Sequence, residues 1–476
     1  MSQLPADCLN EIFEYLDDEM PALYSCMLVN HQWCESSVRV FWRDVWVLKI
    51  PHFRTLIACL PNESKEILYK NGIVIPPPTP NPPMFNYAKF CKVISTKIIH
   101  FQIEVLLKSQ QSLLPQNLEN NISIVLKEIY KMYMSQIGSL QTLTFWANMT
   151  FDLTTAGAKD CLKHVSELVC GVEMSSEYFY QLSQLCPNLS SICLLVKDDV
   201  SKGLLDFISS QNNLKKLDIR IITENQMDEI IPLLKNLNNL KTFIIYGRRS
   251  VSFIAQFTNL QELDITFNYE QTIEELQNNI FPQLQILKIQ NHFANYEVLI
   301  NFLKNNGKNL KELYVNDEDG YCDNSLNLSI SKFCPNIRKL SIGFKKDGLE
   351  TLIIVLKNFQ YLEYFTIWCG KEFLSEKEAL EAVVKYSNKN FYELILDLNF
   401  IGANLLPEDL ESFFNSWKNR IPQKSLSFVI TNYDKSSVEY DHNMKIVEKY
   451  SELGVIKFKI IDDFSDLSFT SSGLRD

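Results

Sequence analysis

The sequence contains no long uninterrupted hydrophobic run. Its first segment, MSQLPADCLNEIFEYLDDEM, is acidic and lacks the basic leader and the apolar run of about 7–15 residues found in a secretory signal peptide. No stretch approaches the roughly 18 apolar residues of a membrane span. We therefore expect a soluble intracellular protein, in the cytoplasm, the nucleus or both, with no membrane partner.

Signatures of catalysis and metal binding are also missing. The sequence contains no glycine-rich nucleotide loop, no GxSxG or HExxH motif, and no paired Cys/His spacing. Its six histidines lie far apart, and its 12 cysteines are scattered without CxxC pairs, so we interpret the cysteines as reduced and mostly buried. These absences predict a protein that is not an enzyme and has no cofactor and no metal site.

Basic residues are too few for a nucleic-acid binder. The chain has 46 Lys and Arg against 57 Asp and Glu, a net charge of −11, whereas binding to phosphate backbones depends on an excess of cations. Its 476 residues, 46% of them hydrophobic, exceed the size at which one compact core keeps growing. This favours several units or an elongated array.

The sequence does contain an internal repeat of the form Leu-x-x-Leu-x-Leu. Examples are Leu214-Lys-Lys-Leu217-Asp-Ile219 and Leu260-Gln-Glu-Leu263-Asp-Ile265, and successive central residues lie 20 to 32 positions apart. Such regular spacing is typical of a repeat protein. The central residues of the copies are Leu143, Leu168, Ile192, Leu217, Phe243, Leu263, Leu287, Leu313, Leu340, Phe365, Leu394, Leu426 and Ile456.

Each copy places two apolar residues on one side of a short strand, and amphipathic helices fill the intervals between copies. The 20-residue step after Phe243 leaves room only for a turn. The pattern resembles leucine-rich repeats of the ribonuclease-inhibitor-like type, which implies an α/β repeat solenoid over residues 136–463, with parallel strands on the concave side and helices outside. The Asn or Cys that usually follows the last apolar position survives only at Asn148 and Asn268, so its backbone-bonding ladder must be largely replaced.

Residues 1–46 form a different, all-helical module. Apolar residues share one helical face, Pro5 suits a first helical turn, and Asn30 is a good helix cap. The segment resembles the F-box in the order and spacing of its motif residues, and the whole chain looks like fungal F-box/leucine-rich-repeat proteins. The matching positions are Leu4, Pro5, Leu9, Ile12, Phe13, Leu16, Leu23, Val29, Trp33, Trp42 and Arg43.

The resemblance implies that the module docks on the Skp adaptor of an SCF-type cullin-RING ubiquitin ligase, while the repeats bind a protein substrate. The implied adaptor-binding residues are the matching positions from Leu4 to Trp33; for Leu9, Ile12 and Leu16, the sequence leaves open whether they contact the adaptor or form local core. A scaffold that acts outside a ubiquitin ligase is the alternative.

Two segments lie outside these parts. Residues 47–135 are predicted to be a helical linker region, interrupted by a proline-rich stretch at 74–85 that should be an exposed loop, with a ligand for an SH3 or WW domain as the alternative. The polar tail, residues 464–476, lacks a repeat and should be poorly ordered and dispensable.

Substrate contacts are predicted on the strands. Residues that alternate with the apolar positions, or follow them, should point to the concave side, where Trp, Tyr and Arg are favoured anchors for a partner. The candidate substrate-binding residues are Trp146, Asp218, Arg220, Tyr246, Asp264, Tyr314, Trp368 and Asp397.

Overall fold

A computed structural model describes residues 4–17, 19–109, 117–146, 151–197, 200–221, 231, 234, 237, 239–247, 251–266, 273–290, 296–316, 324–398, 405–421, 424–431, 433 and 439–461. The chain divides into two compact units. Unit 1 comprises Met1–Lys215 with Asp228–Asn236, and unit 2 comprises Lys216–Met227 with Leu237–Leu474. The predicted tail at 464–476, Asn148 and Asn268 lie outside the described residues.

Unit 1 begins with a three-helix module: α1 (Ala6–Glu14), α2 (Met20–Met27) and α3 (His31–Phe41). Asn30 caps α3 as predicted, because its Oδ1 accepts a hydrogen bond from the backbone N–H of Trp33 at 3.0 Å. The buried core of the module consists of Leu9, Phe13, Leu23 and Val40, with Leu16, Met20, Cys26 and Trp33 packed against it.

The described residues in the rest of unit 1 form four parallel strands and their helices. The elements are η1 (Val45–Val47), α4 (Ile50–Ala58), α5 (Asn62–Lys70), η2 (Tyr87–Phe90), β1 (Val93–Ser95), α6 (Thr96–Lys108), α7 (Leu118–Gln136), β2 (Thr142–Phe145), α8 (Ala158–Leu162), β3 (Glu167–Gly171), α9 (Ser176–Leu185), β4 (Ser191–Val196) and α10 (Lys202–Ser209). Strand β1 lies inside the predicted helical linker. It pairs with β2 through Ile94 and Leu143, so the parallel sheet begins earlier than the repeat pattern does.

Unit 2 contains ten strands among its described residues, each parallel to its neighbour in the chain. The strands are β5 (Lys216–Ile221), β6 (Thr242–Tyr246), β7 (Glu262–Thr266), β8 (Ile286–Gln290), β9 (Glu312–Asn316), β10 (Lys339–Gly343), β11 (Tyr364–Trp368), β12 (Glu393–Asp397), β13 (Leu426–Thr431) and β14 (Ile456–Ile461). The helices are η5 (Ser252–Gln256), η6 (Glu274–Leu276), α12 (Tyr296–Asn306), η7 (Gly307–Asn309), α13 (Asn324–Phe333), α14 (Leu349–Asn358), α15 (Glu376–Tyr386), α16 (Pro407–Lys418) and α17 (Tyr440–Glu452).

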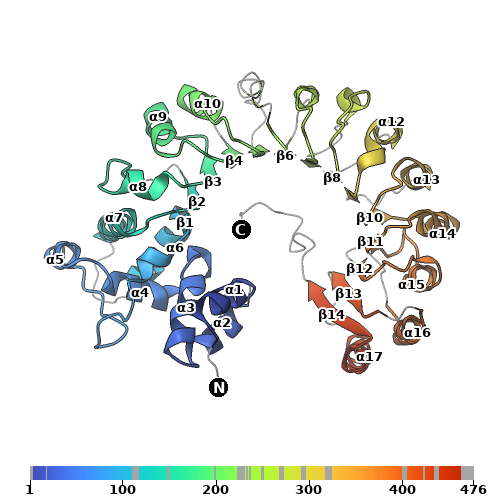
Figure 1. The fold of residues 1–476 in the computed structure, drawn as a ribbon, viewed down its shortest axis with the longest axis horizontal. Helices are drawn as coiled ribbons and strands as arrows, with labels where there is room; N and C mark the ends of the chain where they lie inside the picture. The colour runs from blue at the N-terminus through green and yellow to red at the C-terminus, as the bar shows by residue number, and fades with distance from the viewer. Residues whose placement is uncertain are drawn as a thin grey trace. The chain divides into compact units, whose positions relative to one another are not determined.

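The predicted fold class is confirmed. Every predicted repeat carries a parallel strand, and within each unit the helices between strands lie on one face of the sheet (Figure 1). Among the described residues of the short step after Phe243, the helical element is the 3-10 helix η5. Two predicted centres are wrong by two positions, because Phe428 and Phe458, rather than Leu426 and Ile456, align with Leu394.

We call the sheet face that carries no helices the open face. Strand alternation separates it from the core: Leu217 and Ile219 are buried beneath the helices, whereas Asp218 and Arg220 belong to the open face.

An amide ladder joins successive repeats at the amino ends of the strands. The side-chain amide of Asn309 donates to the carbonyl of Pro282 at 2.9 Å, and that of Asn336 donates to the carbonyl of Lys308 at 2.8 Å. The sequence analysis expected a replacement for the usual ladder but did not locate it. The signal was present, because Asn directly precedes the first apolar position in several repeats.

Asn306 is a buried residue that also forms hydrogen bonds between repeats. Its Oδ1 accepts from the backbone N–H of Phe281 at 2.7 Å, and its Nδ2 donates to the carbonyls of Asn279 and Phe302 at 2.9 and 3.1 Å. We predict that Asn306→Ala lowers the free energy of unfolding by about 1–3 kcal/mol, because it leaves a buried N–H without an acceptor. Chemical denaturation of the full chain measures this loss.

The control is Asn301→Ala, an exposed position on the same helix. It should change the free energy of unfolding by no more than about 0.5 kcal/mol. Equal losses for the two variants would show that the buried amide has no special role.

Candidate functional site

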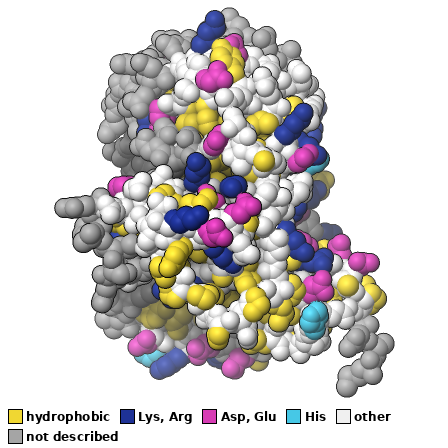
Figure 2. Space-filling view, turned by 90° about the vertical axis from the view of Figure 1, so that its left-hand side faces the viewer, with side chains coloured by type: hydrophobic (Ala, Val, Ile, Leu, Met, Phe, Trp, Pro, Cys, Tyr) yellow, Lys and Arg dark blue, Asp and Glu magenta, His cyan; other side chains and the backbone are white. Residues whose placement is uncertain are grey.

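The N-terminal module presents apolar side chains to solvent. Leu4 is 48% exposed, Ile12 45% and Val29 56%, and Pro5 is exposed at the start of α1. Figure 2 shows the face on the side of α4 and α5, the helices that follow this module in the chain, and hydrophobic side chains gather in the lower half of that face. Exposed apolar residues grouped on one small module are characteristic of a protein-binding surface.

The other predicted adaptor contacts lie inside the module. Leu9, Phe13 and Leu23 are at most 1% exposed, so these three residues form its core and are not available to a partner. Leu16 and Trp33 are partly buried against that core. The apolar residues of the three short helices form both the core and the exposed surface of the module. Only the packing of the helices distinguishes the core residues from the surface residues.

The sequence analysis missed three exposed apolar residues of this module. They are Tyr15, Tyr24 and Leu28, and Leu28 is 87% exposed. The sequence could have revealed them, because each is an apolar residue that lies outside the helical stripe of buried residues. Tyr24 is also bonded to the next part of unit 1, with its hydroxyl 2.6 Å from Nε2 of His52, and burial lowers the pKa of that imidazole.

Arg43 ties the ends of the module together. Its guanidinium forms ion pairs with Glu14, at the end of α1, and with Asp17 at 2.8 Å. These bonds hold the carboxyl end of α1 against the segment after α3, so Arg43 positions the helix that carries Ile12 and that Leu4 and Pro5 precede.

The open face of unit 2 is more crowded than the strand pattern suggested. Four of the predicted substrate contacts, Asp218, Tyr314, Trp368 and Asp397, are at most 6% exposed, which corrects their assignment to an accessible surface. Neighbouring strands lie only about 4.8 Å apart, so side chains on one face cover one another.

Each of these buried residues has a partner on the sheet or in a loop beside it. The guanidinium of Arg220 contacts both carboxylate oxygens of Asp218 at 3.4 Å, and the hydroxyl of Tyr314 donates to Glu312 at 3.0 Å. The ring of Trp368 packs edge-on against Phe373. The hydroxyl of Thr431 donates to Asp397 at 2.9 Å. Among the candidates in this unit, Tyr246 is 43% exposed, and Arg220 and Asp264 are half-buried.

Asp264 stands in a charged group on the open face. Burial raises the pKa of its carboxyl to about 7. The positive charges of Lys288 and Arg220 oppose this rise in pKa, whereas the negative charges of Glu262 and Asp218 add to it. Lys288 is itself paired with Glu262 at 2.9 Å, so its charge is only partly available to Asp264.

The open face of unit 1 carries the remaining candidate, Trp146. The ammonium groups of Lys97 and Lys197 each lie 5.7 Å from the centre of the indole ring. The indole is half-buried, and its Nε1 is a buried donor without an acceptor among the described residues. Two cations on one aromatic ring provide contacts for a partly anionic partner.

The proline-rich stretch is exposed over most of its length, as expected. It closes one side of a cavity of about 570 Å³ whose other side is formed by α4 and α5. The lining is mainly apolar, with Ile57, Leu68, Ile73 and Val74 among its residues.

The described side chains contain no group of three His, Cys, Asp or Glu residues that could hold a metal ion, and their cysteines form no disulfide. Burial raises the pKa of the Cys161, Cys186 and Cys334 thiols to about 12, so these thiols are protonated and unreactive at neutral pH. No helix within the described ranges has both the length and the apolarity to cross a bilayer.

Residues 1–47 match the family model described as F-box-like. The chain therefore carries an F-box-like domain at its N-terminus, followed by parallel strands alternating with helices in a leucine-rich-repeat-like fold. No curated protein matches this chain.

Solved structures with low similarity to this chain include the following three. The yeast Rad7 and Elc1 complex matches at 15% identity over 71% of this chain and 87% of that chain, with a TM-score of 0.38. The leucine-rich-repeat protein LegL7 from Legionella pneumophila matches at 12% identity over 58% and 94%, with a TM-score of 0.36. The TLR13–ssRNA13 complex matches at 13% identity over 65% and 61%, with a TM-score of 0.32. At these scores, no property of those proteins is transferred to this chain.

Two adjacent residues of α1 test the division between core and surface. Phe13 is buried and Ile12 is 45% exposed. Phe13→Ala should destabilise the N-terminal module by about 3–5 kcal/mol, because it removes a core aromatic ring, whereas Ile12→Ala should cost less than about 1 kcal/mol. Hydrogen exchange of the amides in α1–α3 measures both, and equal protection in the two variants would contradict the assignment.

The raised pKa of Asp264 gives a pH-dependent prediction. The folded protein holds this proton more tightly than the unfolded chain does, so the free energy of unfolding falls as the pH rises from about 4 through about 7. We expect Asp264→Asn to stabilise unit 2 by roughly 1–3 kcal/mol at pH 8 and by much less at pH 5. Denaturation curves at both pH values check this, and a pH-independent effect would rule the explanation out.

Proposed function

We propose that this protein is the substrate-recognition subunit of an SCF-type cullin-RING ubiquitin ligase. Its F-box-like module binds the Skp adaptor, its repeats bind a protein substrate, and the chain itself performs no chemistry. We also propose that it acts inside the cell, in the cytoplasm, the nucleus or both. We propose further that it is one of the fungal proteins of this architecture.

One observation carries the proposal. The segment that matches the F-box-like model is also the segment whose motif residues Leu4, Pro5, Ile12 and Val29 stand exposed around a closed core. Apolar burial contributes about 25 cal/mol per Å², so a few such side chains are sufficient to anchor an adaptor. The core residues keep the three helices in place beneath that surface.

The repeats supply the second surface. Trp146 in unit 1, and Arg220, Tyr246 and Asp264 in unit 2, remain accessible or half-buried on the open face. Aromatic and arginine side chains are the residue types enriched among the strong contacts of protein interfaces. They are therefore our candidates for substrate contact.

A scaffold that acts outside a ubiquitin ligase is the second candidate function. It shares the module and the repeats, and it differs only in the partners that assemble on them. Affinity purification of the full chain followed by mass spectrometry separates the two, because only the ligase subunit brings down adaptor and cullin together.

Adaptor docking is tested by the double substitution Leu4→Ala with Pro5→Ala. We predict that it reduces co-precipitation with a recombinant Skp adaptor at least about tenfold, which corresponds to a loss of about 1.4 kcal/mol of binding free energy. Leu4 and Pro5 are exposed, so the circular dichroism spectrum should not change.

The matched control replaces two exposed apolar residues of unit 2, Leu328→Ala with Ile354→Ala. These substitutions should leave adaptor binding intact. Unchanged binding in the Leu4/Pro5 variant would overturn docking at these positions, and lost binding with an altered spectrum would place the two residues in the folding unit instead.

A further inference from the structure

A lysine-rich depression lies at the amino ends of β11 and β12 in unit 2. It has a volume of about 590 Å³, within the roughly 300–1,000 Å³ typical of ligand sites. We call it the lysine pocket. Its lining residues are Leu356, Lys357, Phe359, Gln360, Tyr361, Lys385, Tyr386, Asn388, Lys389 and Asn390.

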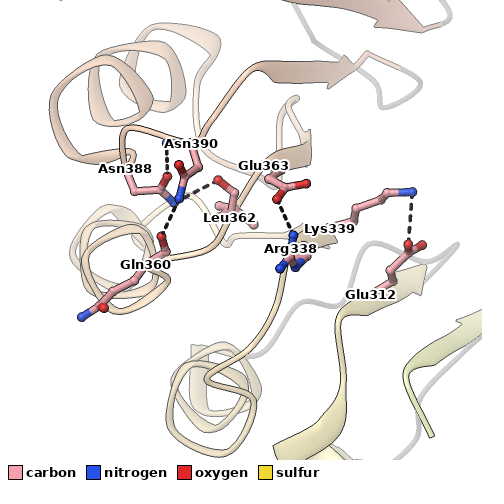
Figure 3. A network of polar contacts seen from close by, with 8 residues as sticks. All are labelled: Glu312, Arg338, Lys339, Gln360, Leu362, Glu363, Asn388 and Asn390. Carbon is pink, nitrogen blue, oxygen red and sulfur yellow. Dashed lines mark hydrogen bonds and ion pairs between the residues drawn. The ribbon is translucent and has the colours of Figure 1, made fainter. Parts of the chain in front are cut away.

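The charge of this lining is opposite to that of the chain. Three of the ten lining residues are lysines and none is acidic, although the whole chain carries a net charge of −11. Lys357, Lys385 and Lys389 are exposed, and none of their ammonium groups forms a hydrogen bond or an ion pair with another described residue. Glu363, which follows the pocket in the chain, is held by Arg338 at 2.8 Å (Figure 3).

Side-chain amides fix the shape of the pocket. Asn388 donates to the carbonyl of Phe359 at 2.8 Å. It also donates to the carbonyl of Leu362 at 2.9 Å, and Asn390 donates to the carbonyl of Gln360 at 3.4 Å (Figure 3). These bonds join the segment after α15 to the segment before β11.

The lysines converge on one aromatic ring. The ammonium of Lys357, on α14, lies 4.9 Å from the centre of the Tyr386 ring, and that of Lys385, on α15, lies 5.2 Å from it. Tyr361, which also lines the pocket, is 48% exposed. Cations and aromatic surface are therefore presented side by side.

A lysine in the last turn of a helix has an ordinary role, because it interacts favourably with the helix dipole. Lys304 of α12 and Lys332 of α13 occupy the same position. That role does not explain why lysines from two helices meet at one ring, nor why Lys389, which lies outside any helix, joins them in a depression without a carboxylate.

We propose that the lysine pocket binds an acidic peptide segment of a partner protein. Three ammonium groups on flexible stems match carboxylates spread along an extended chain, and Tyr361 offers a surface for its backbone and side chains. A compact phosphate dianion fits less well, because the pocket lies at the carboxyl ends of α14 and α15, whose carbonyls repel concentrated negative charge. This proposal does not depend on the adaptor.

The test uses the full chain and a fluorescein-labelled peptide of alternating Glu and Gly at low ionic strength. The same peptide with Gln in place of Glu should bind about tenfold more weakly, a difference of about 1.4 kcal/mol. Lys357→Gln with Lys389→Gln should reduce binding of the Glu peptide by at least the same factor. Lys389→Gln alone should also weaken binding, without altering a helix end.

The matched control is Lys304→Gln with Lys332→Gln, which removes the same charge from the helix ends outside the pocket. It should leave the affinity within about twofold. Equal affinity for the Glu and Gln peptides, or an equal loss in the control, would overturn the proposal. So would displacement of the Glu peptide by equimolar inorganic phosphate, since that would identify a site for a compact dianion.

Discussion

The structure depends on one constraint: a strand of Leu-x-x-Leu-x-Leu type cannot bury its apolar side alone. Leu217, Phe243 and Leu263 are fully buried only because β5, β6 and β7 stack in register, with each central residue opposite the next. Each repeat therefore contributes part of its neighbour's core. The turns depend on neighbouring repeats in the same way. The side-chain amides of Asn309 and Asn336 each donate a hydrogen bond to a backbone carbonyl of the preceding repeat.

The same stacking decides what the open face can offer. Strands held in register bring equivalent side chains close together, so a large residue is covered by its neighbours even on the face without helices. Trp368 also points away from the core, and it is buried because Phe373 packs edge-on against its ring. Charges placed there become partners of one another, as Asp218 and Arg220 do, and a carboxyl such as Asp264 takes up a proton more readily because burial disfavours its charge.

Periodicity was sufficient to predict the parallel strands, their order and the short connection after Phe243. It could not predict β1, which has only three residues and no repeat motif, nor the positions of Phe428 and Phe458, where Leu426 and Ile456 fit the pattern equally well. For the candidate site, alternation predicted the direction of a side chain but not its exposure. Likewise, the F-box resemblance named Leu9 and Ile12 together, and only packing placed one in the core and the other at the surface.

The side chains available to a partner must therefore lie at positions that the stacking of the repeats does not bury. In the N-terminal module these are Leu4, Ile12 and Val29, which stand outside a core too small to cover them. On the open face they are half-buried residues such as Trp146 and Arg220. At the amino ends of β11 and β12 they are lysines. The side-chain amides of Asn388 and Asn390 already bond the backbone carbonyls there, so the lysines are not needed for that role. Ammonium groups without carboxylate partners contribute little to folding, and their convergence on Tyr386 is better explained by a ligand than by the stability of the repeats.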